Sequence, residues 1–141
     1  MQVNLEVNPG SYAILAYEPG KIVINLPAGM AIPSPEDPNN LSRRETLNSS
    51  LIISPVKLIR NWPPQSFDEL TRTHFEQLTE LEPEIVLFGS GSRLRWPDPA
   101  LLAPLINNGI GVEIMDTGAA CRTYNVLMAD GRNFVAALLM I

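Results

Sequence analysis

The chain contains very little of what metal and redox sites are built from. Its 141 residues include one cysteine, Cys121, and one histidine, His74. A single cysteine excludes an intrachain disulfide and any metal site made of several cysteines. A single histidine has no second imidazole with which to share an ion and leaves few ways to build a base–nucleophile pair. We therefore predict no metal site, no cofactor and no catalytic residue, and we interpret both side chains as structural.

Basic residues and long apolar runs are also scarce. The chain has 10 lysines and arginines against 15 aspartates and glutamates, a net charge of −5. It thus lacks the basic field that attracts phosphate backbones, and nucleic-acid binding is not expected. No stretch approaches the ~20 apolar residues of a membrane span, and the first residues do not resemble a signal peptide. The sequence predicts a cytoplasmic protein without membrane insertion.

The length and the hydrophobic content of 45% suit one globular domain over residues 1–141, with two portions of different character. Residues 1–65 hold nine of the thirteen prolines and form a β-rich portion. Within it we predict a hairpin of residues 12–17 and 22–26 around Pro19-Gly20, an irregular loop over residues 32–40, and a strand at 50–55.

Residues 66–141 alternate between helix and strand patterns. Ser66 and Glu69 predict a capping box for a helix over residues 67–81, and Asp98-Pro99 predicts the start of a second helix. The other predicted elements are strands at 85–88, 111–115 and 133–140 and a helix at 117–129. This alternation predicts an α/β fold of three layers around a mixed, mainly parallel sheet, with a hairpin-rich N-terminal portion. The last strand can join its neighbour in either direction.

Two strand-to-helix junctions are the candidate functional site. In α/β proteins ligands bind outside the carboxyl ends of the strands, where glycine lets backbone N–H groups approach and a helix N-terminus favours an anion. The sequence therefore predicts a pocket for a small anionic ligand between residues 89–93 and 116–122. The candidate ligand-binding residues are Gly89, Ser90, Gly91, Arg93, Asp116, Thr117 and Arg122.

A structural interpretation of the same residues stays open. The dinucleotide fingerprint Gly-x-Gly-x-x-Gly is incomplete because position 94 is leucine. Asp116 suits a helix cap without any further role. Arg122 lies about 200° around its helix from Ala120, which is predicted to face inward, so it points away together with Asn125. Either the arginine side chain curls back to the junction, or both residues face a partner or another layer.

Several motifs of the chain, taken in order, resemble the Mth-domain family. The resemblance covers nearly all of residues 3–140 and is strongest from residue 85 onward. The motifs are SLIISP at 50–55, WP at 62–63, LFGSG at 87–91, GIGVEIMDT at 109–117, ACRTYNVL at 120–127, GR at 131–132 and AAL at 136–138. The family pattern has threonine in the place of Ser90, a change that keeps the hydroxyl.

The resemblance implies a three-layer α/β domain and no established enzymatic activity. A mitochondrial member of the family assists the assembly of a respiratory complex, which implies a protein-binding role. Two hypotheses follow. The first and favoured one is a non-enzymatic interaction or assembly domain that binds a protein partner or forms a homodimer. The alternative is a protein that binds a small anionic ligand, or a weak enzyme, and uses the predicted pocket.

Overall fold

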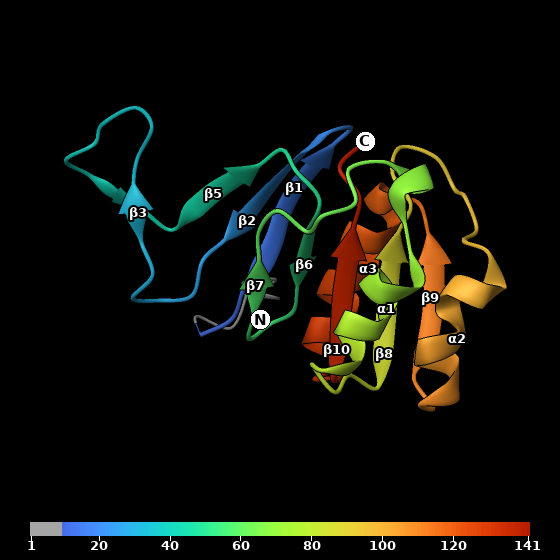
Figure 1. The fold of residues 1–141 in the computed structure, drawn as a ribbon. Helices are drawn as coiled ribbons and strands as arrows, with labels where there is room; N and C mark the ends of the chain where they lie inside the picture. The colour runs from blue at the N-terminus through green and yellow to red at the C-terminus, as the bar shows by residue number, and fades with distance from the viewer. Residues whose placement is uncertain (1–9) are drawn as a thin grey trace.

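The computed structural model describes residues 10–141, which form a five-stranded sheet, a smaller three-stranded sheet and three α-helices (Figure 1). Residues 1–9, on which the signal-peptide prediction depends, lie outside the described part of the chain. Helices α1 (Arg72–Thr79) and α2 (Pro99–Asn107) cover one face of the larger sheet, and α3 (Thr117–Ala129) covers the other. The predicted three-layer α/β architecture is confirmed.

The larger sheet is mixed, and its parallel part comes from the second half of the chain. Its strands, in spatial order, are β7 (Leu58–Ile59), β6 (Leu51–Ile53), β10 (Phe134–Leu138), β8 (Ile85–Gly89) and β9 (Gly111–Met115). Strands β10, β8 and β9 are mutually parallel, whereas β6 is antiparallel to β10 and to β7. Of the two directions that the sequence allows for the last strand, the structure shows the parallel one, with β10 beside β8.

Strand β10 packs against the helical layers on both faces of the larger sheet. All five of its residues are buried. Phe134, Ala136 and Leu138 pack on the α3 side, while Val135 and Ala137 pack on the side of α1 and α2. A central strand covered on both faces needs apolar residues at every position, which explains its uninterrupted apolar sequence.

The first half of the chain adds the smaller sheets. Strands β1 (Ala13–Glu18), β2 (Lys21–Asn25) and β5 (Arg44–Leu47) form an antiparallel sheet in that order. This confirms the predicted hairpin, which turns at Gly20 with φ of 80°. The predicted irregular loop over residues 32–40 is wrong at its start, because its first two residues form β3 (Ile32–Pro33), which pairs with β4 (Leu41–Ser42) just beyond the loop.

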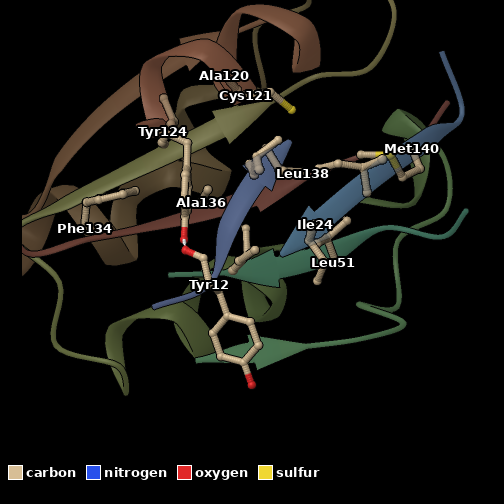
Figure 2. Close-up of a cluster of buried hydrophobic side chains, with 14 of the residues drawn as sticks. Tyr12, Ile24, Leu51, Ala120, Cys121, Tyr124, Phe134, Ala136, Leu138 and Met140 are labelled. Atoms are coloured by element: carbon tan, nitrogen blue, oxygen red, sulfur yellow. Dashed lines mark hydrogen bonds between the residues drawn. The ribbon is translucent and has the colours of Figure 1, made fainter. Parts of the chain in front are cut away.

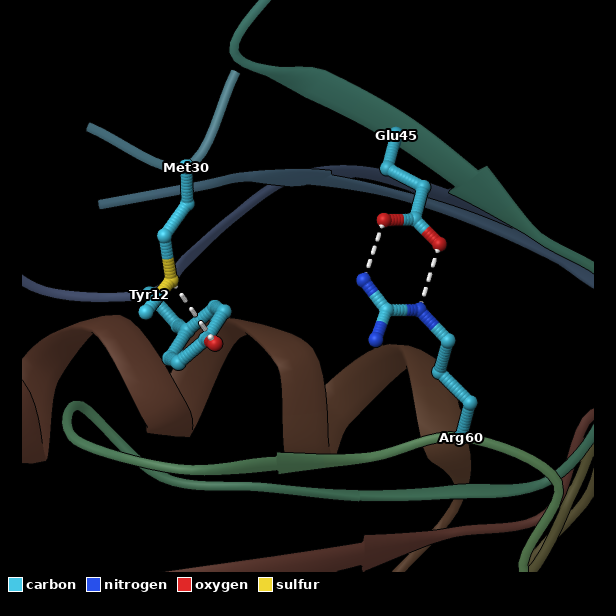
Figure 3. A network of polar contacts seen from close by, with 4 residues as sticks. All are labelled: Tyr12, Met30, Glu45 and Arg60. Carbon is cyan, nitrogen blue, oxygen red and sulfur yellow. Dashed lines mark hydrogen bonds and ion pairs between the residues drawn. The ribbon is translucent and has the colours of Figure 1, made fainter. Parts of the chain in front are cut away.

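A bidentate ion pair joins the smaller sheet to the chain beyond β7. The Arg60 Nε and Nη2 atoms donate to the two carboxylate oxygens of Glu45 on β5, at 2.7 and 2.6 Å (Figure 3). The parallel pairing of guanidinium and carboxylate fixes the orientation of both groups. In the same region the Tyr12 hydroxyl donates to the Met30 sulfur at 3.3 Å.

The helix predicted over residues 67–81 begins later than its sequence pattern indicates. Phe67–Glu69 form a single turn of 3-10 helix, and Leu70 is extended. The Ser66 side chain makes no cap hydrogen bond, so the predicted capping box is wrong. The α-helix starts after Thr71, whose N–H donates to His74 Nδ1 at 3.0 Å. By contrast, Asp98 caps α2 as predicted, through a bond from the Ala100 N–H.

A second cluster of contacts attaches α3 to both sheets. Ala120, Cys121 and Tyr124 form its buried stripe. The Tyr124 ring meets Phe134 of β10 edge-on, with 5.0 Å between centroids, and its hydroxyl donates to the Tyr12 carbonyl oxygen at 2.8 Å (Figure 2). One side chain of α3 thus contacts the central sheet and the segment that leads into β1.

We expect Tyr124→Phe to lower the free energy of unfolding by about 1–3 kcal/mol, because the buried Tyr12 carbonyl loses its donor. Urea denaturation measures this change. Tyr12→Phe is the matched control, since it removes a hydroxyl bonded only to the weak sulfur acceptor of Met30. Equal losses for the two variants would show that the Tyr124–Tyr12 bond does not hold α3 to the hairpin.

We also expect stability to fall as pH decreases below about 6.5, because His74 must stay unprotonated to accept from Thr71. Burial lowers the pKa of His74 below its usual value, against a smaller opposing effect of Glu69. The unfolded chain therefore takes up the proton first, so this contribution is complete above the unfolded pKa and declines as pH falls toward the folded one. His74→Gln keeps an acceptor that does not titrate. A loss of stability between pH 7.5 and 5.5 that is equally steep in this variant and in the original chain would contradict the assignment.

Candidate functional site

The two predicted junctions lie side by side at the carboxyl ends of β8 and β9. In the register of these parallel strands Gly89 is paired with Met115. Asp116 follows β9 and caps α3, since its Oδ1 accepts from the Ala119 N–H at 2.8 Å. The cap interpretation of Asp116 is confirmed.

The hydroxyl of Thr117 is the centre of this edge of the sheet. The side chain is fully buried, and its Oγ1 accepts from the Gly91 N–H at 2.8 Å and donates to the Leu139 carbonyl at 2.9 Å. The Thr117 N–H donates in turn to the Gly91 carbonyl at 2.8 Å. One threonine therefore joins the loop after β8, the start of α3 and the end of β10.

The glycines of the loop approach the protein itself. A Cβ atom at Gly89 would lie 2.8 Å from Thr117 Oγ1, and one at Gly91 would lie 2.5 Å from Ile141 Cγ1. The neighbouring Ser90 is buried, and its hydroxyl donates to the Arg93 carbonyl and accepts from the Arg95 N–H. Both glycines are positions of close approach, as the sequence indicates, but the groups that come close to them are protein side chains, those of Thr117 and Ile141.

The arginines near these junctions face in different directions. Arg93 is exposed. The Arg95 guanidinium lies 4.1 Å from the centre of the Phe67 ring and pairs with Asp68, on the α1 side of the sheet. Arg122 lies on the α3 side, at a groove beside β1. Ligand binding by the seven candidate residues stays a prediction.

The groove between β1 and α3, here called the β1–α3 groove, has a volume of about 160 Å³. It is lined by Ile14, Leu15, Ala16, Tyr17, Gly118, Cys121, Arg122 and Asn125. Gly118 leaves room for the Tyr17 ring, which lies 3.4 Å from where a Cβ would be. The Asn125 amide donates to the Ile14 carbonyl at 3.0 Å, so α3 covers part of the β1 edge. Of the two predicted orientations of Arg122, the structure shows the one toward another layer.

Burial raises the pKa of two ionisable groups of the groove. Burial raises the pKa of the Cys121 thiol to about 12, with a smaller opposing effect of Arg122. At neutral pH this thiol is protonated and a poor nucleophile, as expected for a small buried side chain. Burial also raises the pKa of Tyr17, and its hydroxyl is buried without a hydrogen-bond partner in the described structure.

Exposed apolar side chains lie beside the groove and beyond the β8 loop. Leu15 is 43% exposed on β1, and Val126, one helical turn after Arg122, is 59% exposed. The two tryptophans have different roles: Trp62 is buried in the core, whereas Trp96 is 67% exposed. Among residues 10–141 no group of three or more potential metal ligands comes together, and no helix there is long and apolar enough to cross a membrane.

Comparison with known protein families identifies the family of the chain. Residues 14–139 match the family described as "Protein of unknown function (DUF498/DUF598)". The chain belongs to this family. Solved structures agree: a Bordetella parapertussis protein is 33% identical with a TM-score of 0.74, covering 94% of this chain and 98% of its own. A Bordetella pertussis protein described as a Mth938-like domain is 27% identical, with a TM-score of 0.73 over 99% of this chain and 92% of its own. The resemblance to the Mth-domain family is confirmed.

Curated relatives of the chain include proteins named as assembly factors. The Bos taurus protein named NADH dehydrogenase [ubiquinone] 1 alpha subcomplex assembly factor 3 is 35% identical over 104 residues. The match covers 70% of this chain and 56% of the relative, so the chain spans little more than half the length of that protein. A Francisella tularensis relative, 26% identical over 61% of this chain and 71% of its own length, is called a 13 kDa major membrane protein. The cytoplasmic location stays a prediction.

We expect Thr117→Val to lower the free energy of unfolding by about 2 kcal/mol or more, because the Gly91 N–H and the Leu139 carbonyl lose their partner in the core. Thr117→Ser keeps the hydroxyl and is expected to cost about 1 kcal/mol for the missing methyl group. Thermal or urea unfolding compares the two. A serine variant as unstable as the valine variant would show that packing, not the hydroxyl, holds the junction.

Proposed function

We propose that this chain is a non-enzymatic protein-binding domain and that the β1–α3 groove receives the partner. The Tyr17 hydroxyl is the observation that carries this proposal. It is buried and has no hydrogen-bond partner within the described structure. A buried hydroxyl without a partner costs about 1–3 kcal/mol. Solvent does not reach this hydroxyl in the free protein, so a bound segment must open the groove at Tyr17 to supply an acceptor and recover this energy.

The other groups of the groove favour the same kind of partner. Arg122 is exposed and forms no ion pair within residues 10–141, so its charge is available to a carboxylate. Leu15 and Val126 offer apolar surface beside it. Interfaces combine apolar contacts with a few charged groups of this kind. We therefore infer a partner segment that carries an acidic side chain next to an apolar one.

The groups best suited to catalysis have structural roles. The Cys121 thiol is held protonated by burial, and His74 Nδ1 accepts the Thr71 N–H at the start of α1. These two residues are the only cysteine and the only histidine of the chain. Their engagement supports binding over catalysis. The assembly-factor name of the relatives supports it at the level of the family, and participation in an assembly process is part of the proposal for this chain.

The anionic-ligand hypothesis has weaker support. Of the seven candidate residues, Arg122 lines the β1–α3 groove, whereas the Gly91 N–H donates within the protein to Thr117. The carboxylate of Asp116 is used as the α3 cap. The arrangement therefore favours a protein segment that meets Arg122 over a small anion held by the glycine loop.

The test is site-specific photo-crosslinking in cells of the source organism. A photoreactive residue at Val126 is expected to capture a defined protein, and the same residue at Ile106 is not. Ile106 is the matched control because it is 57% exposed on α2, against 59% for Val126 on α3. Capture of the same proteins from both positions would contradict the proposed groove.

Arg122→Glu is expected to abolish the capture at Val126 by repelling the acidic partner, with little change in melting temperature because Arg122 is exposed. Trp96→Ala tests the competing surface beyond β8. Capture that survives Arg122→Glu but is lost with Trp96→Ala would move the interface to that loop. A crosslink between two copies of the chain would identify the partner as a homodimer.

A further inference from the structure

A second cavity lies at the opposite end of the sheet from the β1–α3 groove. It lies where β6 turns away from β10, since their pairing ends at Ile53 and Ala136. Its volume is about 220 Å³, more than the groove. We call it the basal cavity, because it is at the amino end of β10.

The walls of the basal cavity are mainly apolar and come from three distant parts of the chain. Pro55 and Val56 belong to the turn between β6 and β7, Leu81 follows α1, and Phe134 and Val135 begin β10. Val56 is 86% exposed, which makes it the most exposed large apolar side chain of the described residues. An apolar chain in the cavity would cover it and remove that surface from water.

The backbone of the turn is bonded within the turn and to the segment before β1, where the Tyr12 N–H donates to the Pro55 carbonyl at 2.9 Å. The Ser54 N–H donates to the Lys57 carbonyl at 2.8 Å, and the Lys57 N–H donates to the Ser54 hydroxyl at 3.0 Å. The Asn133 side chain donates to the Glu82 carbonyl at 3.0 Å. The exposed charged groups of the cavity are the ends of two cationic side chains.

Those cations are Lys57 and Arg132, both exposed and both lining the cavity. Neither forms an ion pair with a carboxylate of residues 10–141. None of the nine lining residues is acidic, in a chain whose net charge is −5. Two unpaired cations beside an apolar wall complement a ligand with an anionic head and an apolar tail.

We propose that the basal cavity binds a short aliphatic chain ending in a carboxylate. The carboxylate would bind between Lys57 and Arg132, and the aliphatic chain would lie against Val56, Leu81 and Val135. The cavity is smaller than the ~300 Å³ at which sites for drug-sized ligands begin, so the apolar part must be short. A free short-chain acid and the C-terminal residue of an apolar peptide both present this chemistry.

The test is an NMR titration of the isotope-labelled chain with hexanoate, hexanol and hexylamine. Hexanoate is expected to shift the amide signals of Val56, Leu81 and Val135. Hexanol and hexylamine lack the anionic head, and we expect them to bind at least about tenfold more weakly, since charge-assisted hydrogen bonds are the strong ones. Equal binding of hexanol, or no shift at the three amides, would overturn the proposal.

Variants distinguish the effect of the two cations of the cavity on binding from the effect of the overall charge of the protein. The double variant Lys57→Gln, Arg132→Gln is expected to bind hexanoate about tenfold or more weakly than the original chain. Arg44→Gln removes an exposed arginine of β5 and is expected to leave the affinity unchanged. An equal effect of the two changes would overturn the site.

The source of the carboxylate is tested with two peptides that end in leucine, one with a free C-terminus and one amidated. Tighter binding of the free peptide than of hexanoate supports the site with a protein C-terminus as its ligand, and tighter binding of hexanoate supports it with a free acid. Binding of the amidated peptide as tight as that of the free one would contradict carboxylate recognition. None of these variants alters Arg122, so failure here leaves the proposed function untouched.

Discussion

The burial of α3 between two sheets is the constraint on which the rest of the molecule depends. Its inner stripe of Ala120, Cys121 and Tyr124 packs on the central strand β10 and on the hairpin of β1 and β2. Tyr124 contacts both layers: its ring packs against Phe134 of β10, and its hydroxyl donates to the Tyr12 carbonyl just before β1. The N-terminal sheet would otherwise face water with its apolar side, and the β1–α3 groove exists only where these two layers meet.

The backbone at the carboxyl end of the parallel strands is satisfied by groups of the protein itself. The segments around Gly91, Thr117 and Leu139 are buried together, so their N–H and C=O groups must find partners inside the protein. The edge that binds ligands in many α/β proteins is thus used for stability. Among the polar groups without a partner in residues 10–141 are the Tyr17 hydroxyl at the groove and the buried Trp62 indole N–H. The side chains of Lys57 and Arg132, at the other end of the sheet, form no ion pair there.

The secondary structure of the second half of the chain was more predictable than that of the first half. The arrangement of the candidate site was less predictable than either. Strand β9 and helix α3 occupy the predicted residues, because their apolar spacing and the Asp116 cap are local signals. The start of α1 was missed because His74, which accepts the Thr71 N–H, is rarely an N3 capping residue. The spacing around α3 correctly turned Arg122 away from Ala120, but it carried no information on which layer Arg122 would meet.

The sequence by itself determined most helices and strands of the second half, the exclusion of an intrachain disulfide by the single cysteine, and which family the chain resembles. Those properties depend on composition and on neighbours within a turn or two of the chain. Only the tertiary structure decided that Gly91 meets Thr117 and Ile141, that Arg122 faces β1, and that Lys57 and Arg132 share a cavity. These residues are far apart along the chain, and their proximity follows from how the layers pack, which no local pattern records.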